Sequence, residues 1–379
     1  MDFDFTDDQV SLRDAVQRWV DKGFTFERRH GIAKAGGATR AVYGELAELG
    51  LTGLVIPEAH GGMGFGPVEA MVVAEELGRG LVNAPFAHGA LVAPVLLSAA
   101  PAALQAEWLP KMASAEALVV LAHQERGARY RLNHVTTRAT PSADGNGSAW
   151  VLNGAKSVVP AGDEADAFVV PARISGAEGD SAGIGLFLVE AAAVQISGYP
   201  TQDGARAAEL LLSATPATLI TADGHALLEQ AVDAGIAAQC AEAVGVMDKL
   251  VAVTIEYMNT RKQFGVTLAS FQALRHRIAD VKMQLELGRS MSYYASLKLG
   301  EAPAQRRRAI SQARAQLGHS MRFVGQQCTQ LHGGIGVTDE YIGSHYFKRL
   351  TVLEMGFGDT LHHLGEVSAR MQDTAGVFA

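Results

Sequence analysis

The hydrophobic pattern of this 379-residue chain changes its period twice. From residue 6 to about residue 111 the apolar residues recur at helical spacing, and Thr6 followed by Gln9 is typical of a capping box that starts a helix. Between 114 and 222, short apolar runs bounded by Gly, Asp and Asn predict β-strands. From Gly224 onward the helical spacing returns. We therefore predict three domains: an N-terminal α-helical domain (1–113), a middle antiparallel β-barrel or sheet (114–222) and a C-terminal helical domain (223–379).

The C-terminal domain contains long stretches of helical spacing joined by short connections. Such an arrangement is typical of an antiparallel four-helix bundle. The last stretch is expected to break near Gly356 and Gly358, because glycine disfavours a helix interior. The predicted helices are 227–259, 270–299, 304–328 and 339–371.

Composition excludes several classes of protein. A formal net charge of -8 and a pI near 5.8 argue against a nucleic-acid partner, because phosphate neutralisation needs a clustered basic face. Cys240 and Cys328 lack Cys-x-x-Cys spacing, which indicates a reducing compartment without a disulfide or zinc framework. The N-terminus is acidic, and no apolar run approaches the roughly 20 residues that span a bilayer. We expect a cytoplasmic protein with no membrane partner.

Two short motifs each follow a predicted helix. They are Arg261-Lys262-Gln263-Phe264-Gly265 and Gln330-Leu331-His332-Gly333-Gly334-Ile335-Gly336. A guanidinium offers a fork of donors to a pyrophosphate, and glycines let backbone N–H groups approach it. Arg261 alone could also be a helix C-terminal cation that complements the macrodipole, but the two motifs together favour a dinucleotide. The run 61–66 lacks Gly-x-Gly-x-x-Gly spacing and lies between helices, so it does not predict a Rossmann site.

The domain order and these motifs resemble the acyl-CoA dehydrogenase family over essentially the whole chain. Further matching stretches are Gly53-Leu54-Val55-Ile56-Pro57-Glu58, Glu75-Glu76-Leu77-Gly78, Leu109-Pro110-Lys111, Asn153-Gly154-Ala155-Lys156 and Phe271-Gln272-Ala273-Leu274. The resemblance implies FAD as cofactor, an acyl-CoA substrate, an electron-transfer flavoprotein as acceptor, and a homotetramer or α2β2 heterotetramer. The cofactor-binding residues that it implies are Arg261, Gln263, Phe264, Gln272, Gln330, Gly333, Gly334, Thr360 and His362.

The family chemistry requires a base, and the two positions that usually carry it have no carboxylate in this chain. A carboxylate removes the α-proton of the thioester while the β-hydride passes to the flavin. Most members place a glutamate in an aromatic-Glu-Gly-Thr run, which reads Phe357-Gly358-Asp359-Thr360 in this chain. A minority place it on the helix before the arginine motif, where this chain has Gly235.

Asp359 is the predicted base, because it directly follows Gly358, the first of the two positions that lack a carboxylate. Asp233 lies two residues before Gly235, so on a helix it points about 200° away from that position. Glu125 and the histidines at 362 and 363 are the other candidates. The histidine pair has no third ligand at metal-binding spacing, so no metal site is predicted.

Two more departures concern the flavin ring and leave the function open between alternatives. The family's Thr-Glu-Pro-x-Ala-Gly-Ser run reads Ala122 to Ala128, and its Trp-Ile-Thr reads Val158-Val159-Pro160. The first alternative is a FAD-dependent acyl-CoA dehydrogenase of lipid or steroid degradation with a wide substrate. The second is a non-catalytic subunit that contacts flavin in a heterotetramer. A flavin oxidase is a third.

Overall fold

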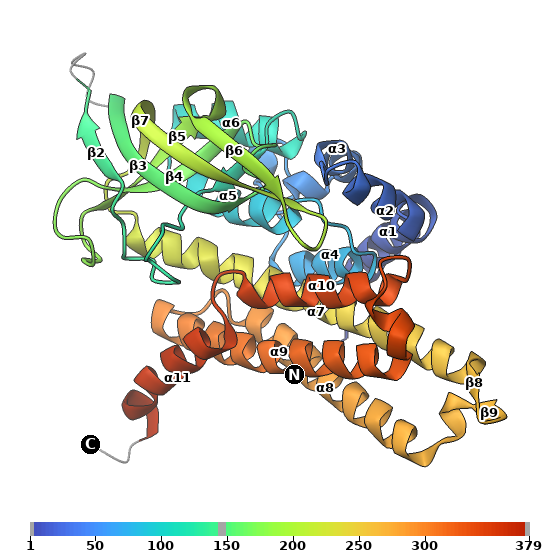
Figure 1. Cartoon of the computed structure of the whole chain (residues 1–379). Helices are drawn as coiled ribbons and strands as arrows, with labels where there is room; N and C mark the ends of the chain where they lie inside the picture. Colours follow the sequence, from blue (N-terminus) through green and yellow to red (C-terminus); the bar gives the residue numbers. More distant parts are fainter. Residues whose placement is uncertain (1–3, 143–148, 376–379) are drawn as a thin grey trace. The chain divides into compact units, whose positions relative to one another are not determined.

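The computed structural model describes residues 4–142 and 149–375 (Figure 1). The acidic N-terminal residues 1–3, on which the expectation of no targeting signal partly depends, lie outside the described residues. The chain divides into two compact units, which are described separately. The first unit comprises Met1–His30, Pro67–Val82 and Ile236–Ala379, and the second comprises Gly31–Gly66 and Asn83–Gly235.

Helices build the first unit. The predicted capping box is confirmed: Thr6 accepts from the Gln9 N–H and starts the first helix. Every predicted C-terminal helix is found, and the break expected near Gly356 separates the last two. The helices are α1 (Asp7–Gly23), α4 (Pro67–Arg79), α7 (His225–Thr260), α8 (Gln272–Leu297), α9 (Pro303–His332), α10 (Ile342–Met355) and α11 (Thr360–Ala375). The first residues of α7, up to Gly235, belong to the second unit. Helix α9 packs against α8, α10 and α11.

Helices α4 and α7 cross with their backbones in contact. A Cβ added at Gly78 would overlap the carbonyl of Glu242, and one added at Gly245 would overlap the carbonyl of Glu75. Each glycine therefore faces the backbone of the other helix. Only glycine allows this approach, because any side chain would push the helix axes apart.

Short helices and a β-barrel build the second unit. The helices are α3 (Arg40–Glu48), α5 (Ala93–Leu97) and α6 (Ala102–Ala113), and α2 (Phe26–Lys34) has its C-terminal part in this unit. The strands are β1 (Val119–Leu121), β2 (Arg138–Pro141), β3 (Ala149–Pro160), β4 (Ala167–Arg173), β5 (Ile184–Glu190), β6 (Gln195–Pro200) and β7 (Arg206–Thr221). Strands β4, β2, β3, β7 and β5 pair in that order, and β5 pairs again with β4, which closes the barrel.

The strand arrangement corrects the prediction of a purely antiparallel sheet. β4 pairs in parallel with β1 and with β2, whereas the other pairs in the barrel are antiparallel. β1 and β4 are buried along their whole length. A strand buried on both faces shows no alternation, so the sequence could not reveal its direction.

A buried ion pair lies beside the barrel. The Lys156 ammonium donates to Glu125 Oε1 at 2.6 Å and to the Pro171 carbonyl at 2.8 Å. Glu125 also accepts from the backbone N–H of Thr136 and from the Thr137 hydroxyl, both at 2.7 Å. Burial alone would raise the pKa of Glu125, but Lys156 and these hydrogen bonds lower it to about 2. The carboxylate is therefore ionised and fully engaged.

Strand β3 is strained at Val158, for which the family resemblance implies a tryptophan. The register between β3 and β7 shifts between Lys156 and Val159, and Val158 has a φ of 51°. A β-branched residue pays a steric penalty in this left-handed region. The Val158 N–H donates to Glu209 Oε1 at 3.0 Å. The side chain of Val158 is exposed.

No helix among residues 4–142 and 149–375 is long and apolar enough to cross a lipid bilayer.

Candidate functional site

The two predicted motifs meet in one cavity of the first unit. The cavity has a volume of about 610 Å³ and opens between the end of α7, the start of α8 and the end of α9. It is lined by Tyr257, Arg261, Gln263, Leu268, Leu274, Arg277, Gln330, Leu331, His332, Gly333, Gly334 and Ile335. Two segments about 70 residues apart in sequence thus share one site.

Local backbone chemistry positions Arg261 at this cavity. Helix α7 ends at Thr260, and the next residues form a small hairpin, β8 (Lys262–Gln263) and β9 (Val266–Thr267). Phe264 and Gly265 form its tip with φ of 53° and 81°. The Leu268 N–H donates to the Arg261 carbonyl at 2.9 Å, which closes the base of the hairpin. The side chain of Arg261 makes no hydrogen bond or ion pair within the described residues.

The glycines at the end of α9 form an open surface. Gly333 ends the helix with a φ of 66°. A Cβ added at Gly333 or at Gly334 would meet no atom within 4 Å, whereas one at Gly336 would lie 2.7 Å from the Thr329 carbonyl. Gly336 is therefore required for packing, and the other two leave space for a ligand to approach their backbone. This cradle and the uncompensated guanidinium fit a dinucleotide pyrophosphate.

Aromatic side chains surround the buried His332 at the cavity. His332 Nδ1 donates to the Cys328 carbonyl at 2.8 Å, so its Nε2 accepts from the Tyr341 hydroxyl at 3.0 Å. Burial lowers the pKa of His332, which keeps the imidazole neutral. The rings of Tyr257 and Tyr341 lie 4.8 and 4.9 Å from it. No sequence pattern distinguishes these aromatic residues or Arg277, although Leu274 and Arg277 have the three-residue spacing of one helix face.

The other predicted cofactor residues do not line this cavity. Phe264 stands 92% exposed at the tip of the hairpin, with its ring 6.3 Å from that of Phe271. Gln272 begins α8 and is exposed. Thr360 and His362 belong to the start of α11, where the base was predicted.

Arg314 fixes the backbone of the turn that precedes Asp359. This buried guanidinium donates to the carbonyls of Gly356 at 2.8 Å and Gly358 at 3.2 Å, and also to that of Leu353. Glu354 accepts from the Thr360 N–H at 3.0 Å and from its hydroxyl at 2.6 Å. The turn therefore has a fixed backbone.

Asp359 caps helix α11. Its Oδ1 accepts from the His362 N–H at 2.8 Å, as an N-cap residue does. Its second oxygen has no hydrogen-bond partner among the described residues, and the side chain is partly exposed. The predicted base is thus oriented by the helix and retains one open oxygen.

Two imidazoles occupy the space beside Gly358, the position at which the family resemblance implies a glutamate. A Cβ at Gly358 would lie 2.5 Å from His363 Nε2 and 2.7 Å from His362 Cδ2, and the φ of Gly358 is 121°. His363 Nε2 donates to the Phe357 carbonyl at 3.3 Å. A side chain at this position would have to displace both rings. Among the other candidate bases, Glu125 is committed to Lys156, and Asp233 is fully buried.

Comparison with known proteins identifies the family. The family model "Acyl-CoA dehydrogenase, N-terminal domain" matches residues 6–116, and the model "Acyl-CoA dehydrogenase, C-terminal domain" matches residues 222–372. The chain belongs to the acyl-CoA dehydrogenase family. This family consists of oxidoreductases, and the helical, β and helical order of the chain fits its fold.

Individual relatives have low sequence identity to this chain but match most of its length. The chain is 27% identical to (2S)-methylsuccinyl-CoA dehydrogenase of Cereibacter sphaeroides over 78% of its own length, but it spans only 57% of that protein. It is 26% identical to the probable acyl-CoA dehydrogenase YngJ of Bacillus subtilis (strain 168), over 94% of this chain and 96% of that one. A Tcur3481-Tcur3483 steroid ACAD variant superposes with a TM-score of 0.86 at 26% identity, over 97% and 99% of the two chains.

The buried imidazole of His363 makes the stability of this member of the acyl-CoA dehydrogenase family sensitive to acid. Burial and the neighbouring Arg314 lower the pKa of His363 from 6.5 to about 2. Its contribution is therefore fully present above pH 6.5 and is lost as the pH falls below that value. Urea denaturation should show that lowering the pH from 7.5 to 5 costs the native chain about 2 kcal/mol more than it costs His363→Gln. An equal loss in both proteins would contradict the lowered pKa.

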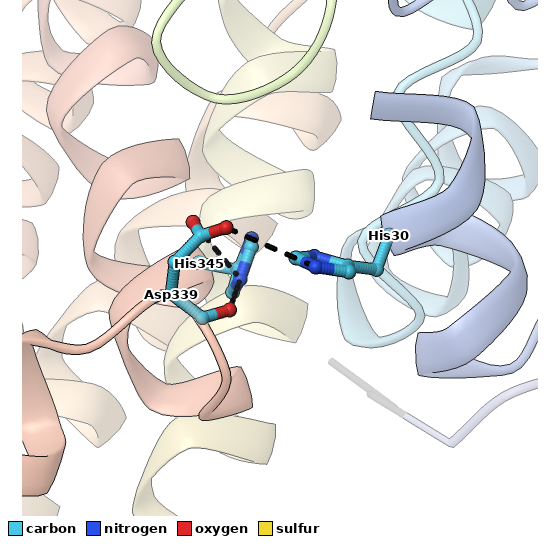
Figure 2. Close-up of side chains that lie close together, drawn as sticks. All are labelled: His30, Asp339 and His345. Atoms are coloured by element: carbon cyan, nitrogen blue, oxygen red, sulfur yellow. Dashed lines mark hydrogen bonds and ion pairs between the residues drawn. The ribbon is translucent and has the colours of Figure 1, made fainter. Parts of the chain in front are cut away.

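A second histidine cluster lies near the glycine loop of this family member. His30 on α2, His345 on α10 and Asp339 between η6 (Gly333–Val337) and α10 converge in Figure 2. His345 Nε2 donates to the Asp339 carbonyl at 2.8 Å, and the Arg29 guanidinium donates to its Nδ1 at 2.7 Å. His30 Nε2 lies 3.8 Å from the Asp339 carboxylate.

Hydrogen bonding accounts for this cluster better than a metal ion does. Both ring nitrogens of His345 are engaged, so a metal would have to break one of these bonds. The Lys348 ammonium is 2.8 Å from Asp339 Oδ1, which adds a second cation beside Arg29. The cluster therefore ties α2 to the segment that follows the glycine loop.

Proposed function

We propose that this chain binds FAD with the pyrophosphate in the cavity of Arg261, Gly333 and Gly334. The single observation that supports this most is that one cavity is lined by the Arg261 guanidinium, which has no partner among the described residues, and by two glycines that leave space for a ligand. Arg261 would supply charge-assisted hydrogen bonds, and the backbone N–H groups of the glycines would supply further donors. Gln263 and Gln330 would fix the adenosine side, with Phe264, Gln272, Thr360 and His362 as the remaining contacts.

We further propose that the chain dehydrogenates an acyl-CoA thioester between Cα and Cβ. The bound flavin supplies a hydride acceptor for the Cβ hydrogen. Asp359 removes the Cα proton, and the bond from the His362 N–H to its Oδ1 orients the open oxygen. Arg314 keeps this carboxylate in place, because it holds the carbonyls of the preceding turn.

Assembly into a tetramer, by pairing of C-terminal four-helix bundles, is part of this proposal. The C-terminal helices carry large apolar side chains in water: Met283 and Leu287 on α8, and Leu361 and Leu364 on α11. Phe264, at the tip of its hairpin, is nearly fully exposed. A homotetramer or α2β2 heterotetramer would bury such side chains, and the flavin whose pyrophosphate this cavity holds would then be shared with a neighbouring subunit. An electron-transfer flavoprotein would then reoxidise the flavin.

The second candidate is a non-catalytic subunit that lends this cavity to a partner's flavin. The observation that favours it is the pair of imidazoles beside Gly358. The similarity to a steroid ACAD whose name joins two polypeptides is consistent with such a subunit and with a bulky substrate in lipid or steroid degradation. Activity of this chain alone separates the two candidates.

Flavin content tests the binding proposal. Arg261→Gln should weaken FAD binding about 10- to 100-fold, because a hydrogen bond to a charged group contributes about 1.5–3 kcal/mol. The measurement is a FAD titration of the deflavinated protein, followed by flavin fluorescence. Lys262→Gln is the matched control, since Lys262 is the exposed neighbour that does not line the cavity, and it should stay within about twofold of the native value. Equal affinities of all three proteins would reject the site.

A further inference from the structure

We propose that Arg277 is a second phosphate-binding residue of the same cavity. The inference rests on the proposed function, because it concerns the dinucleotide that Arg261 would hold. Arg277 lies on α8, one helical turn after Leu274, and both residues line the cavity. Arg275 and His276, which lie between them in sequence, do not. Of Arg275, His276 and Arg277, only Arg277 lines the cavity.

The cavity is positively charged. Its lining contains the guanidinium groups of Arg261 and Arg277 and no acidic residue. His332 adds no charge, because burial and the Cys328 carbonyl keep it neutral. Neither arginine side chain makes a hydrogen bond or an ion pair within the described residues. Both arginines are exposed to solvent, which screens their repulsion, and an anionic ligand in the cavity of about 610 Å³ could pair with both charges.

The pyrophosphate bridge of a dinucleotide has the matching charge. Each of its two phosphates is a diester-like group with one ionised oxygen, so the bridge carries two negative charges. One guanidinium for each phosphate would neutralise the bridge, and each can offer two parallel N–H donors. Arg277 would thereby determine that the site takes a pyrophosphate-containing ligand, such as FAD or its ADP half.

The test compares Arg277→Gln with Arg275→Gln in the full-length, deflavinated protein. Arg275 is the matched control, because it is an exposed arginine on the same turn of α8 that does not line the cavity. FAD and ADP are titrated separately, and riboflavin, which lacks the bridge, is the third probe. Arg277→Gln should weaken binding of both FAD and ADP about tenfold. It should leave riboflavin binding unchanged, and Arg275→Gln should stay within about twofold throughout.

Two further measurements exclude a merely structural effect. The dependence of FAD affinity on salt concentration should become shallower in Arg277→Gln, because one of two screened cations is gone. Arg277→Lys should recover part of the affinity, since the charge returns without the fork of donors. Thermal melting without ligand should be unchanged in both variants.

The outcomes separate this inference from the function on which it rests. Weak FAD binding in Arg261→Gln with native binding in Arg277→Gln would overturn the inference and leave the flavin site intact. Native binding in both variants would overturn both. A change of subunit assembly in Arg277→Gln without a change in FAD or ADP affinity would show that Arg277 meets a neighbouring subunit, which also overturns the inference.

Discussion

Replacing Lys156 by methionine is expected to destabilise the chain by about 3–5 kcal/mol, because breaking a buried ion pair leaves an uncompensated charge. Lys156 and Glu125 are almost wholly removed from water. The carboxylate would stay in place, since Thr136 and Thr137 still donate to it, but without the ammonium it would be an isolated buried anion. Methionine fills much of the same space, so the loss reports the charge rather than a cavity.

Urea denaturation followed by tryptophan fluorescence measures this loss. The matched control is Lys298→Met, which breaks an exposed pair with Glu301 and should change stability by less than about 1 kcal/mol. Combining Lys156→Met with Glu125→Gln should recover part of the stability, because the isolated anion is then removed. A loss below about 1 kcal/mol in the single variant would show that the pair is not an essential part of the barrel.

Asp359→Asn is expected to lower the dehydrogenation rate about 10²- to 10⁴-fold, the usual contribution of a general base. Asparagine is as good an N-cap as aspartate, so the bond from the His362 N–H and the start of α11 should persist. The substitution therefore removes the base and retains the structure. Bleaching of the flavin by an acyl-CoA in the absence of oxygen measures the reaction.

Exchange of the Cα hydrogen in deuterated water measures the proton transfer separately and should fall in parallel. Glu366→Gln is the control on the same helix, since Glu366 already pairs with Arg370 and should not affect the rate. An unchanged rate in Asp359→Asn would show that another group is the base. If the native chain bleaches only after it is mixed with a homologous chain, it is the non-catalytic subunit, and peroxide release during turnover would indicate an oxidase.

The sequence was sufficient to predict the cavity because its residues lie at the ends of long helices. Arg261 follows α7 directly, and Gly333 follows α9 directly, so the helical period located both motifs. Arg277 was not predicted, because it lies inside α8, where an exposed arginine has no distinguishing pattern. The strands β2 and β6 carry little signal for a related reason: both are largely exposed and lack an apolar run.

The state of the base position could not be predicted from residue identity alone. The sequence showed that Gly358 leaves this position without a carboxylate, but only coordinates show that His362 and His363 occupy the space beside it. The cluster of His30, Asp339 and His345 was likewise hidden, because its members come from segments about 300 residues apart. Such proximity depends on helix packing, which the sequence pattern does not specify.

The glycines at the crossing of α4 and α7 also have a mechanical consequence. Because the carbonyl oxygens of each helix contact the glycine α-carbons of the other, α4 and α7 cannot slide or rotate against each other without a steric clash between backbone atoms. We expect amide hydrogen exchange to be slowest on both sides of this junction, so the pair should behave as a stiff frame. Any backbone movement that a large cofactor needs in order to enter should therefore occur in the β8–β9 hairpin after α7 and in the glycine loop after α9.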